Sequence, residues 1–339
     1  MLRIRWAILC ALTLILYLGT AGHRSMAADT IGTIRRVDPR FDELVPKGAK
    51  LERLASGFEW SEGPVWDKRG QYLLFSDVPK NVVLKWQPGA KVVTFLKPSG
   101  YTGTKHRIGE PGSNGLLIDP NGRLILCQHG DRRVARLEAD GKFTTLADRY
   151  EGKRFNSPND LALKSNGDLY FTDPPYGLEA RNDDPAKELP FSGVYRLSKD
   201  GQLTLLAKEL TYPNGLAFSP DEKTLYIAQS DPNAAVWYAF DVKSDGTLGR
   251  SRVFFDATRW AKEGQKGLPD GLKVDRRGNL FATGPGGVHI FTPIGELLGS
   301  IDPGEATANC GWGGDGSMLY VAADMNLCRI QTNTRGAGF

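Results

Sequence analysis

A short motif recurs six times along this chain of 339 residues, and it constrains the fold more than any other feature of the sequence. Each copy begins with an Asn, Asp or Glu, continues through a short apolar run and a polar turn, and then enters a second apolar run. The copies lie 39 to 56 residues apart and begin at Glu62, Asn114, Asn159, Asn214, Asp270 and Asn309. Such a period indicates a repeat architecture in which each unit packs on its neighbours.

Each copy is interpreted as a strand, a tight turn and a second strand, because short apolar runs alternate with glycine-containing turns. Most copies continue into a third and a fourth strand, as at residues 133–146 and 194–206. Four strands per unit of this length are typical of a propeller blade. The sequence therefore predicts an all-β fold, a six-bladed β-propeller with four-stranded blades. The last copy has room for about three strands, so we expect residues 50–55 to supply its outer strand and close the ring.

The N-terminus has the layout of a secretory signal peptide. Arg3 and Arg5 precede an apolar run over residues 6–19, and small residues follow up to Ala28. We expect cleavage after residue 27 and export to the periplasm or the medium, with no membrane contact afterwards. A retained membrane anchor is the alternative, because the apolar run is not far short of a spanning helix. The rest of the chain divides into an N-terminal extension (28–49), the propeller (50–332) and a C-terminal tail (333–339).

The charge of the chain bears on its binding partners, and its cysteines bear on disulfide formation. The chain has 43 basic and 39 acidic residues, and three of the basic ones lie in the first 27 residues, which contain no acid. A nearly neutral mature chain offers no electrostatic footprint for nucleic acid, so we expect no nucleic-acid partner. Cys127, Cys310 and Cys328 remain after signal cleavage and show no C-x-x-C spacing. Cys310 and Cys328 either pair or are buried free thiols, and the sequence predicts no oligomeric state.

The residues that open the six copies all carry side-chain oxygen. In a propeller the innermost strands surround a central channel, so residues at equivalent positions converge there. Amide and carboxylate oxygens suit a hard cation such as Ca²⁺. These positions hold no histidine or cysteine, which disfavours zinc or copper. Any single Asn-Gly or Asp-Gly is also ordinary turn chemistry. Six at one register indicate a converging site.

These motifs resemble those of the gluconolactonase, regucalcin and senescence-marker group of six-bladed propellers. The resemblance covers residues 41–330 and rests on SEGPVW at 61–66, SPNDL at 157–161, YPNGL at 212–216 and PDG at 269–271. It implies one divalent cation held by Glu62, Asn159, Asn214 and Asp270. Ca²⁺ is the preferred ion, and Zn²⁺, Mn²⁺ or Mg²⁺ remain alternatives in activity. It also implies hydrolysis of a lactone as the reaction.

The expected mechanism assigns roles to the remaining polar residues. The cation polarises the lactone carbonyl, and Asp270 takes a proton from the attacking water. Asn114 is a candidate for binding substrate hydroxyls or for an outer ligand position, and Asn309 can be either. His129 either contacts substrate or is a hydrogen-bonded strand-end histidine. Tyr176 either stacks on a ring substrate or packs against a proline turn.

The leading hypothesis is therefore an exported, metal-dependent lactonase acting on a sugar lactone of the gluconolactone type. Three alternatives use the same fold. The site can serve a promiscuous esterase or phosphotriesterase, a non-catalytic calcium-binding propeller, or a sugar enzyme with different chemistry. The chain has no G-x-S-x-G motif, which argues against a serine hydrolase. Residues 98–112 form a loop between the first two copies and are expected to be a lid or a rim loop.

Overall fold

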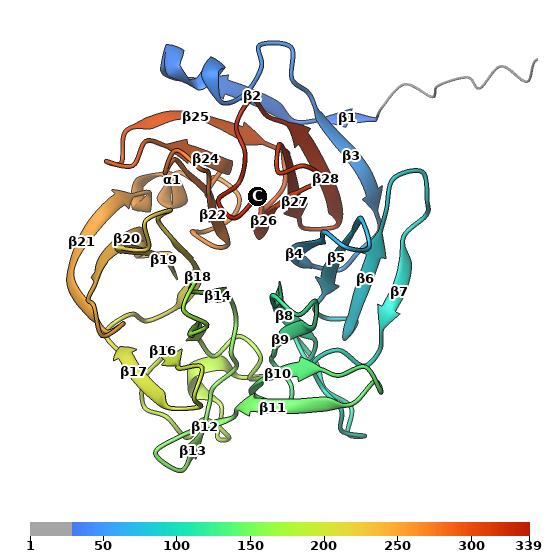
Figure 1. Ribbon diagram of the computed structural model, residues 1–339, viewed down its shortest axis with the longest axis vertical. Coiled ribbons are helices and arrows are strands. Elements are labelled where there is room, and N and C mark those ends of the chain that lie inside the picture. Colours follow the sequence, from blue (N-terminus) through green and yellow to red (C-terminus); the bar gives the residue numbers. More distant parts are fainter. Residues whose placement is uncertain (1–28) are drawn as a thin grey trace, which may run out of the picture.

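Six β-sheets stand around a common centre in the computed structural model, which describes residues 29–339 (Figure 1). The predicted six-bladed β-propeller is confirmed. The inner strands of neighbouring blades contact one another in a closed ring, so each repeat packs mainly on the repeats beside it. The proposed signal peptide, residues 1–27, lies outside the described residues. Across residues 29–339, no helix combines the length and the apolar character needed to cross a bilayer.

The first four blades each contain four antiparallel strands that are consecutive in the sequence. Blade 1 consists of β4 (Ser61–Asp67), β5 (Tyr72–Asp77), β6 (Val82–Trp86) and β7 (Val93–Leu96). Blade 2 consists of β8 (Ser113–Ile118), β9 (Leu124–Gln128), β10 (Arg133–Leu137) and β11 (Phe143–Ala147). Blade 3 consists of β14 (Leu161–Leu163), β15 (Leu169–Asp173), β16 (Gly193–Leu197) and β17 (Leu203–Ala207). Blade 4 consists of β18 (Pro213–Phe218), β19 (Thr224–Asp231), β20 (Ala234–Val242) and β21 (Leu248–Asp256).

The last two blades each gain strands from the N-terminal part of the chain. Blade 5 consists of β22 (Leu272–Val274), β23 (Leu280–Gly284), β24 (Gly287–Phe291), β25 (Leu297–Asp302) and, at its outer edge, β2 (Thr33–Arg36). Blade 6 consists of β26 (Asn309–Gly313), β27 (Met318–Ala323), β28 (Asn326–Gln331), β3 (Leu51–Ser56) and β1 (Thr30–Ile31). The expected closing strand is thus present as β3, and β1 and β2 cover two further sheet edges.

Five short elements of the described chain lie outside the blades. A two-stranded ribbon of β12 (Arg149–Tyr150) and β13 (Lys153–Arg154) connects blades 2 and 3. The 3-10 helix η1 (Pro39–Glu43) follows β2, and η2 (Arg181–Asp183) lies in the long connection between β15 and β16. The one α-helix within residues 29–339, α1 (Thr258–Lys262), follows blade 4.

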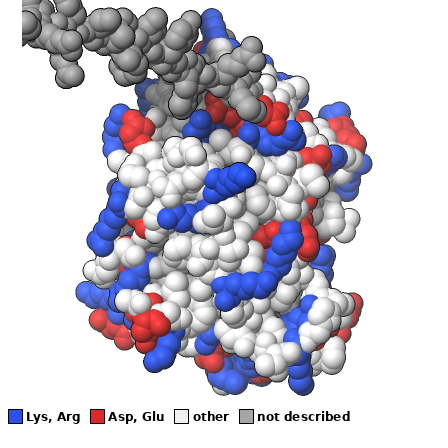
Figure 2. Space-filling view, turned by 90° about the vertical axis from the view of Figure 1, so that its right-hand side faces the viewer, with Lys and Arg blue, Asp and Glu red and all other residues white. Residues whose placement is uncertain are grey.

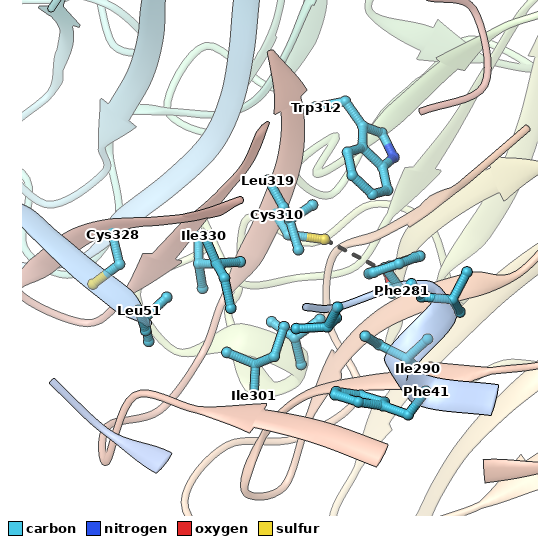
Figure 3. Close-up of a cluster of buried hydrophobic side chains, with 14 of the residues drawn as sticks. Phe41, Leu51, Phe281, Ile290, Ile301, Cys310, Trp312, Leu319, Cys328 and Ile330 are labelled. Carbon is cyan, nitrogen blue, oxygen red and sulfur yellow. Dashed lines mark hydrogen bonds between the residues drawn. The ribbon is translucent and has the colours of Figure 1, made fainter. Parts of the chain in front are cut away.

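Blades 5 and 6 pack on each other through a large apolar cluster that includes N-terminal residues (Figure 3). Phe41 from η1 and Leu51 from β3 are both almost fully buried in it, together with Phe281 and Ile290 of blade 5. The structure gives Cys310 and Cys328 as buried free thiols within this cluster, which excludes the pairing alternative in this structure. On the face drawn in Figure 2, basic and acidic side chains are interspersed over a largely uncharged surface.

Candidate active site

Six of the residues singled out from the sequence line one cavity at the centre of the propeller. The cavity has a volume of about 440 Å³. Among its lining residues are Glu62, Asn114, Asn159, Tyr176, Asn214 and Asp270. The first five repeats therefore bring their opening residues together, as equivalent positions in a propeller must.

Several inner strands contain a β-bulge next to the residue that opens the repeat. Glu62 pairs with Ser76 across β4 and β5, and the register then shifts before Val65. The register shifts in the same way after Ser113 in β8 and after Pro213 in β18. Bulges of this kind re-aim a side chain near the rim of a sheet. They turn the opening residue of these repeats into the cavity.

Glycine after the opening residue lets neighbouring inner strands approach closely. Gly63 has a φ of 53°, and a Cβ at this position would overlap the carbonyl oxygen of Asn114 in blade 2. A Cβ on Gly215 would overlap the carbonyl oxygen of Asp270 in blade 5. Because these strands touch through backbone alone, the side chains before the glycines converge on a small volume.

Four oxygens at the centre of the cavity lack any hydrogen-bond donor within the described part of the chain. They are the Oδ1 atoms of Asn114, Asn159, Asn214 and Asp270, and all four are buried. Asn214 shows why its oxygen is free, since its Nδ2 donates to Ser230 Oγ at 3.0 Å and holds the amide in one orientation. Buried acceptors are nearly always satisfied in folded proteins, so four converging exceptions call for a cation or other donor.

The chemistry of this donor set fits an oxygen-seeking divalent ion. Glu62 and Asp270 supply carboxylates and the asparagines supply neutral amide oxygens, which is the ligand type that Ca²⁺ prefers. Across residues 29–339, no group of three or more His, Cys, Asp and Glu side chains is placed to hold a metal. The amides are therefore needed to complete the site, and a zinc site of nitrogen and sulfur ligands does not fit.

A second layer of polar groups lies behind Glu62. Asn309 of β26 donates from Nδ2 to Glu62 Oε2 at 3.0 Å and to Asp160 Oδ2 at 3.4 Å. The backbone N–H of Gly63 donates to the same Glu62 oxygen at 2.8 Å. Asn309 does not line the cavity and instead orients Glu62 from behind. This separates it from the other five repeat-opening residues.

The carboxyl groups at the centre destabilise one another when ionised. Burial, followed by the negative charge of Asp160, raises the pKa of Glu62 to about 8. Burial, followed by the charges of Glu62 and Asp160, also raises the pKa of Asp270 well above its ordinary value. A divalent cation between Glu62 and Asp270 would reverse this preference, because metal ligands bind in their deprotonated forms.

Tyr176 and His129, the two remaining predicted residues, have different surroundings. Tyr176 lines the cavity, and its ring stacks on that of Tyr212 at a centroid distance of 5.7 Å. His129 is fully buried and does not line the cavity. Its Nδ1 lies 3.5 Å from Glu110 Oε2, and burial lowers its pKa to about 3. The structure therefore places the neutral His129 ring behind Glu110, without direct access to a bound substrate.

Several cavity residues were missed by the sequence analysis. Glu110, Arg181 and Ser230 line the cavity but belong to no repeat position. Glu110 is the only acid in residues 98–112, and that was the available signal. Asp160 replaces the glycine that follows the opening residue in the clearer copies, so a break in the repeat marked it.

Residues 98–112 form a rim loop that is held in place by hydrogen bonds. Asn81 Oδ1 accepts from the backbone N–H groups of Gly100 at 2.7 Å and Tyr101 at 3.1 Å. At the other end, the N–H of Gly112 donates to Val78 O at 2.9 Å, and the N–H of His129 donates to Gly112 O at 3.1 Å. Of the two expectations, the rim loop agrees with these contacts better than a freely moving lid.

Comparison with known proteins places this architecture in a family. Residues 60–324 match the family described as SMP-30/Gluconolactonase/LRE-like region. A gluconolactonase of Zymomonas mobilis is 43% identical over 323 residues, covering 93% of this chain and 90% of the relative. The chain belongs to this family. The resemblance inferred from its motifs is thereby confirmed.

A solved structure and a more distant relative are also similar to this chain. The solved structure of a gluconolactonase from Xanthomonas campestris superposes with a TM-score of 0.78 at 34% identity, covering 90% of this chain and 97% of that one. A diisopropyl-fluorophosphatase of Loligo vulgaris is 26% identical over 251 residues, covering 69% of this chain and 76% of the relative. The relatives of this chain thus include both lactone and organophosphate hydrolases by name.

Proposed function

We propose that this family member is a gluconolactonase-type hydrolase that opens a sugar lactone at the central cavity with the help of a divalent cation. The observation that carries the proposal is the convergence of unpaired oxygens from Asn159, Asn214 and Asp270 beside the Glu62 carboxyl. The 43% identity with a named gluconolactonase over nearly the whole chain supports the lactone as substrate.

The residues have separate roles in this proposal. Glu62, Asn159, Asn214 and Asp270 would hold the cation, with Ca²⁺ as the preferred ion. A divalent cation supplies Lewis acidity toward a carbonyl oxygen. Asp270 accepts a proton from the attacking water. Asn114 offers its amide to substrate hydroxyls.

The reaction balances with one water and one lactone. The water oxygen bonds to the carbonyl carbon, one of its protons passes to Asp270, and the bond from that carbon to the ring oxygen breaks. The ring oxygen keeps the electron pair and takes up a proton, which gives a hydroxy acid. Tyr176, which lines the cavity and stacks on Tyr212, offers an aromatic face for the lactone ring.

The test is lactone hydrolysis by the chain beginning at Ala28. The protein is treated with chelator, and Ca²⁺, Mg²⁺, Mn²⁺ or Zn²⁺ is then returned singly, with the spontaneous opening of gluconolactone subtracted. We expect activity to disappear with the chelator and to return with at least one ion. A folded protein that binds Ca²⁺ but opens no aldonolactone under any ion contradicts the proposal.

An organophosphatase or esterase activity at the same cavity is the second candidate. The similarity to diisopropyl-fluorophosphatase over 69% of the chain favours including it. Paraoxon and a nitrophenyl ester, assayed beside gluconolactone, separate the two activities. If the turnover number for paraoxon or the nitrophenyl ester exceeds that for gluconolactone, lactone opening is the side reaction. A propeller that only binds an ion would hydrolyse none of the three substrates.

Export belongs to the proposal as well. Residues 1–27 are proposed to be removed as a signal peptide, which places the mature enzyme in the periplasm or the medium. The N-terminal sequence and mass of the protein recovered outside the cytoplasm test this. A protein that retains Met1 and remains with the membrane fraction would support the anchor instead.

A further inference from the structure

We propose that Glu110 is a second proton-transfer residue of this site and donates a proton to the ring oxygen as the lactone opens. This inference rests on the proposed lactonase function and deepens it. It concerns a residue that lies outside the six repeat positions and outside the proposed cation ligands.

The position of Glu110 across the cavity from Asp270 is the first argument. Glu110 lies near the end of the rim loop that leads into blade 2, whereas Asp270 lies two residues before β22 of blade 5. Blades 2 and 5 are opposite each other in a ring of six (Figure 1). Two carboxyl groups therefore reach the same cavity from segments next to opposite blades, so one can serve the attacking water and the other the leaving oxygen.

The rigidity of its support is the second argument. The two residues after Glu110 are fixed to the end of β9, because the N–H groups of His129 and Gly130 donate to Gly112 O and Pro111 O, each at 3.1 Å. Arg107 of the same loop donates to Gly130 O and to Gly177 O, each at 2.8 Å. A proton donor must hold its position to within a fraction of an ångström, and this loop provides that support.

The surroundings of the Glu110 carboxyl are the third argument. The fully buried, neutral His129 ring closes off the rear, with its Nδ1 3.5 Å from Glu110 Oε2. Burial raises the pKa of Glu110 to about 7, against the opposing positive charge of Arg181. A carboxyl group with this pKa is partly protonated at neutral pH, which is the condition for an effective general acid.

The proton balance closes with both carboxyl groups. Asp270 begins ionised and Glu110 begins protonated. Asp270 takes one proton from the attacking water, and the Glu110 proton goes to the ring oxygen as its bond to the carbonyl carbon breaks. Transfer of the proton from Asp270 through solvent in the open cavity to Glu110 then restores both groups.

The test is the Glu110→Gln variant, which keeps the shape of the side chain but removes its acidic proton. Glu179→Gln is the matched control, because Glu179 lies on the same rim, contacts Arg107 at 3.8 Å and does not line the cavity. We expect Glu110→Gln to lower kcat for gluconolactone by about 100-fold or more, with KM within threefold. Calorimetric titration of the chelator-treated variant with Ca²⁺ should give a Kd within threefold of the parent.

The pH profile gives a readout that a merely structural role would not move. The groups facing Glu110 are His129, Arg181 and Tyr176, with Glu62 and Asp270 across the cavity. With the cation bound Glu62 and Asp270 stay ionised, so the loss of the Glu110 proton should make kcat of the parent fall as pH rises through the pKa of Glu110, which burial raises above its ordinary value. That falling limb should be absent in Glu110→Gln and present in Glu179→Gln.

Three outcomes overturn the inference. A kcat within threefold of the parent removes the proton-transfer role, and a rise in KM at unchanged kcat makes Glu110 a substrate-binding residue. A Ca²⁺ Kd weakened tenfold or more makes it a ligand. If Glu110→Gln does not fold, Glu110→Asp carries the test, since a shorter carboxyl must keep the falling limb at reduced kcat. A parent that opens no lactone refutes the proposed function instead.

Discussion

Replacing Asn309 with leucine should weaken cation binding without touching any proposed ligand. Asn309 Nδ2 donates to Glu62 Oε2 at 3.0 Å and to Asp160 Oδ2 at 3.4 Å, and its Oδ1 accepts from the N–H of Cys310 at 2.9 Å. Leucine has a similar size and branches at the same carbon, so Asn309→Leu removes the donor while largely filling the same space.

The magnitude follows from the shorter of the two hydrogen bonds to carboxylate. A hydrogen bond to a charged group contributes roughly 1.5–3 kcal/mol, and about 1.4 kcal/mol corresponds to a tenfold change in an equilibrium constant. The Kd for Ca²⁺ should therefore rise about 10- to 100-fold, which is the usual range for a residue that orients a metal ligand. The apolar side chain also favours the protonated form of Glu62, which acts in the same direction.

The assay is calorimetric titration of chelator-treated protein with Ca²⁺ at pH 7, with urea unfolding of the same samples. Asn326→Leu is the control, because Asn326 is also buried in blade 6, at 5% exposure, and no hydrogen bond joins its side chain to Glu62 or Asp160 in the described residues. An unchanged Kd for Asn309→Leu would refute the reasoning that Asn309 positions Glu62. Equal weakening in both variants would show that loss of a buried amide in this blade is sufficient.

Three further predictions concern the same molecule. Asp270→Ala should lower kcat for gluconolactone by at least about 100-fold, and a variant that keeps the ion and nearly full turnover contradicts the assignment of Asp270 as proton acceptor. In chelator-treated protein the pKa of Glu62 is raised from 4.5 to about 8, so the folded state binds this proton more tightly than the unfolded state. The stability that protonated Glu62 contributes is lost as pH rises from 4.5 toward 8. With chelator the urea midpoint of unfolding should therefore fall over this pH range, and with saturating Ca²⁺ it should fall much less. If the midpoint falls equally with pH in both conditions, the result contradicts a cation at Glu62. Leu51→Ala should lower the free energy of unfolding by about 2–5 kcal/mol, because Leu51 is 2% exposed in the apolar cluster between blades 5 and 6. The Kd for Ca²⁺ should stay unchanged. A changed Kd would show that the closing strand β3 also shapes the site.

The repeat made the fold and most of the site predictable. Asn114, Asn159 and Asn214 occur at one register, and a propeller brings such positions together whatever the loops do. Asn309 shares that register but reaches only the layer behind Glu62, because its amide turns toward two buried carboxyl groups. Register predicts where a backbone lies and leaves the direction of each side chain to local contacts.

Residues outside the repeat were not predictable in the same way. Glu110 and Arg181 reach the cavity from loops that have no period to place them. His129 is buried because the loop of the next blade covers it, with Gly177 so close that a Cβ there would overlap the His129 side chain. That contact joins residues 48 positions apart and depends on the shapes of two loops, which apolar patterning does not specify.

The pairing of β3 with β28 makes ring closure depend on the order of synthesis. β3 emerges from the ribosome among the first folded residues, yet its partner strand is made almost last, and β2 likewise waits for β25. Contacts between residues so far apart in sequence form slowly. A nascent chain can thus assemble blades 1 to 4 while its two ends stay open to each other. Until the C-terminal strands exist, β2 and β3 have no blade to join. The C-terminal strands β25 and β28 therefore control when the N-terminal strands β2 and β3 become fixed.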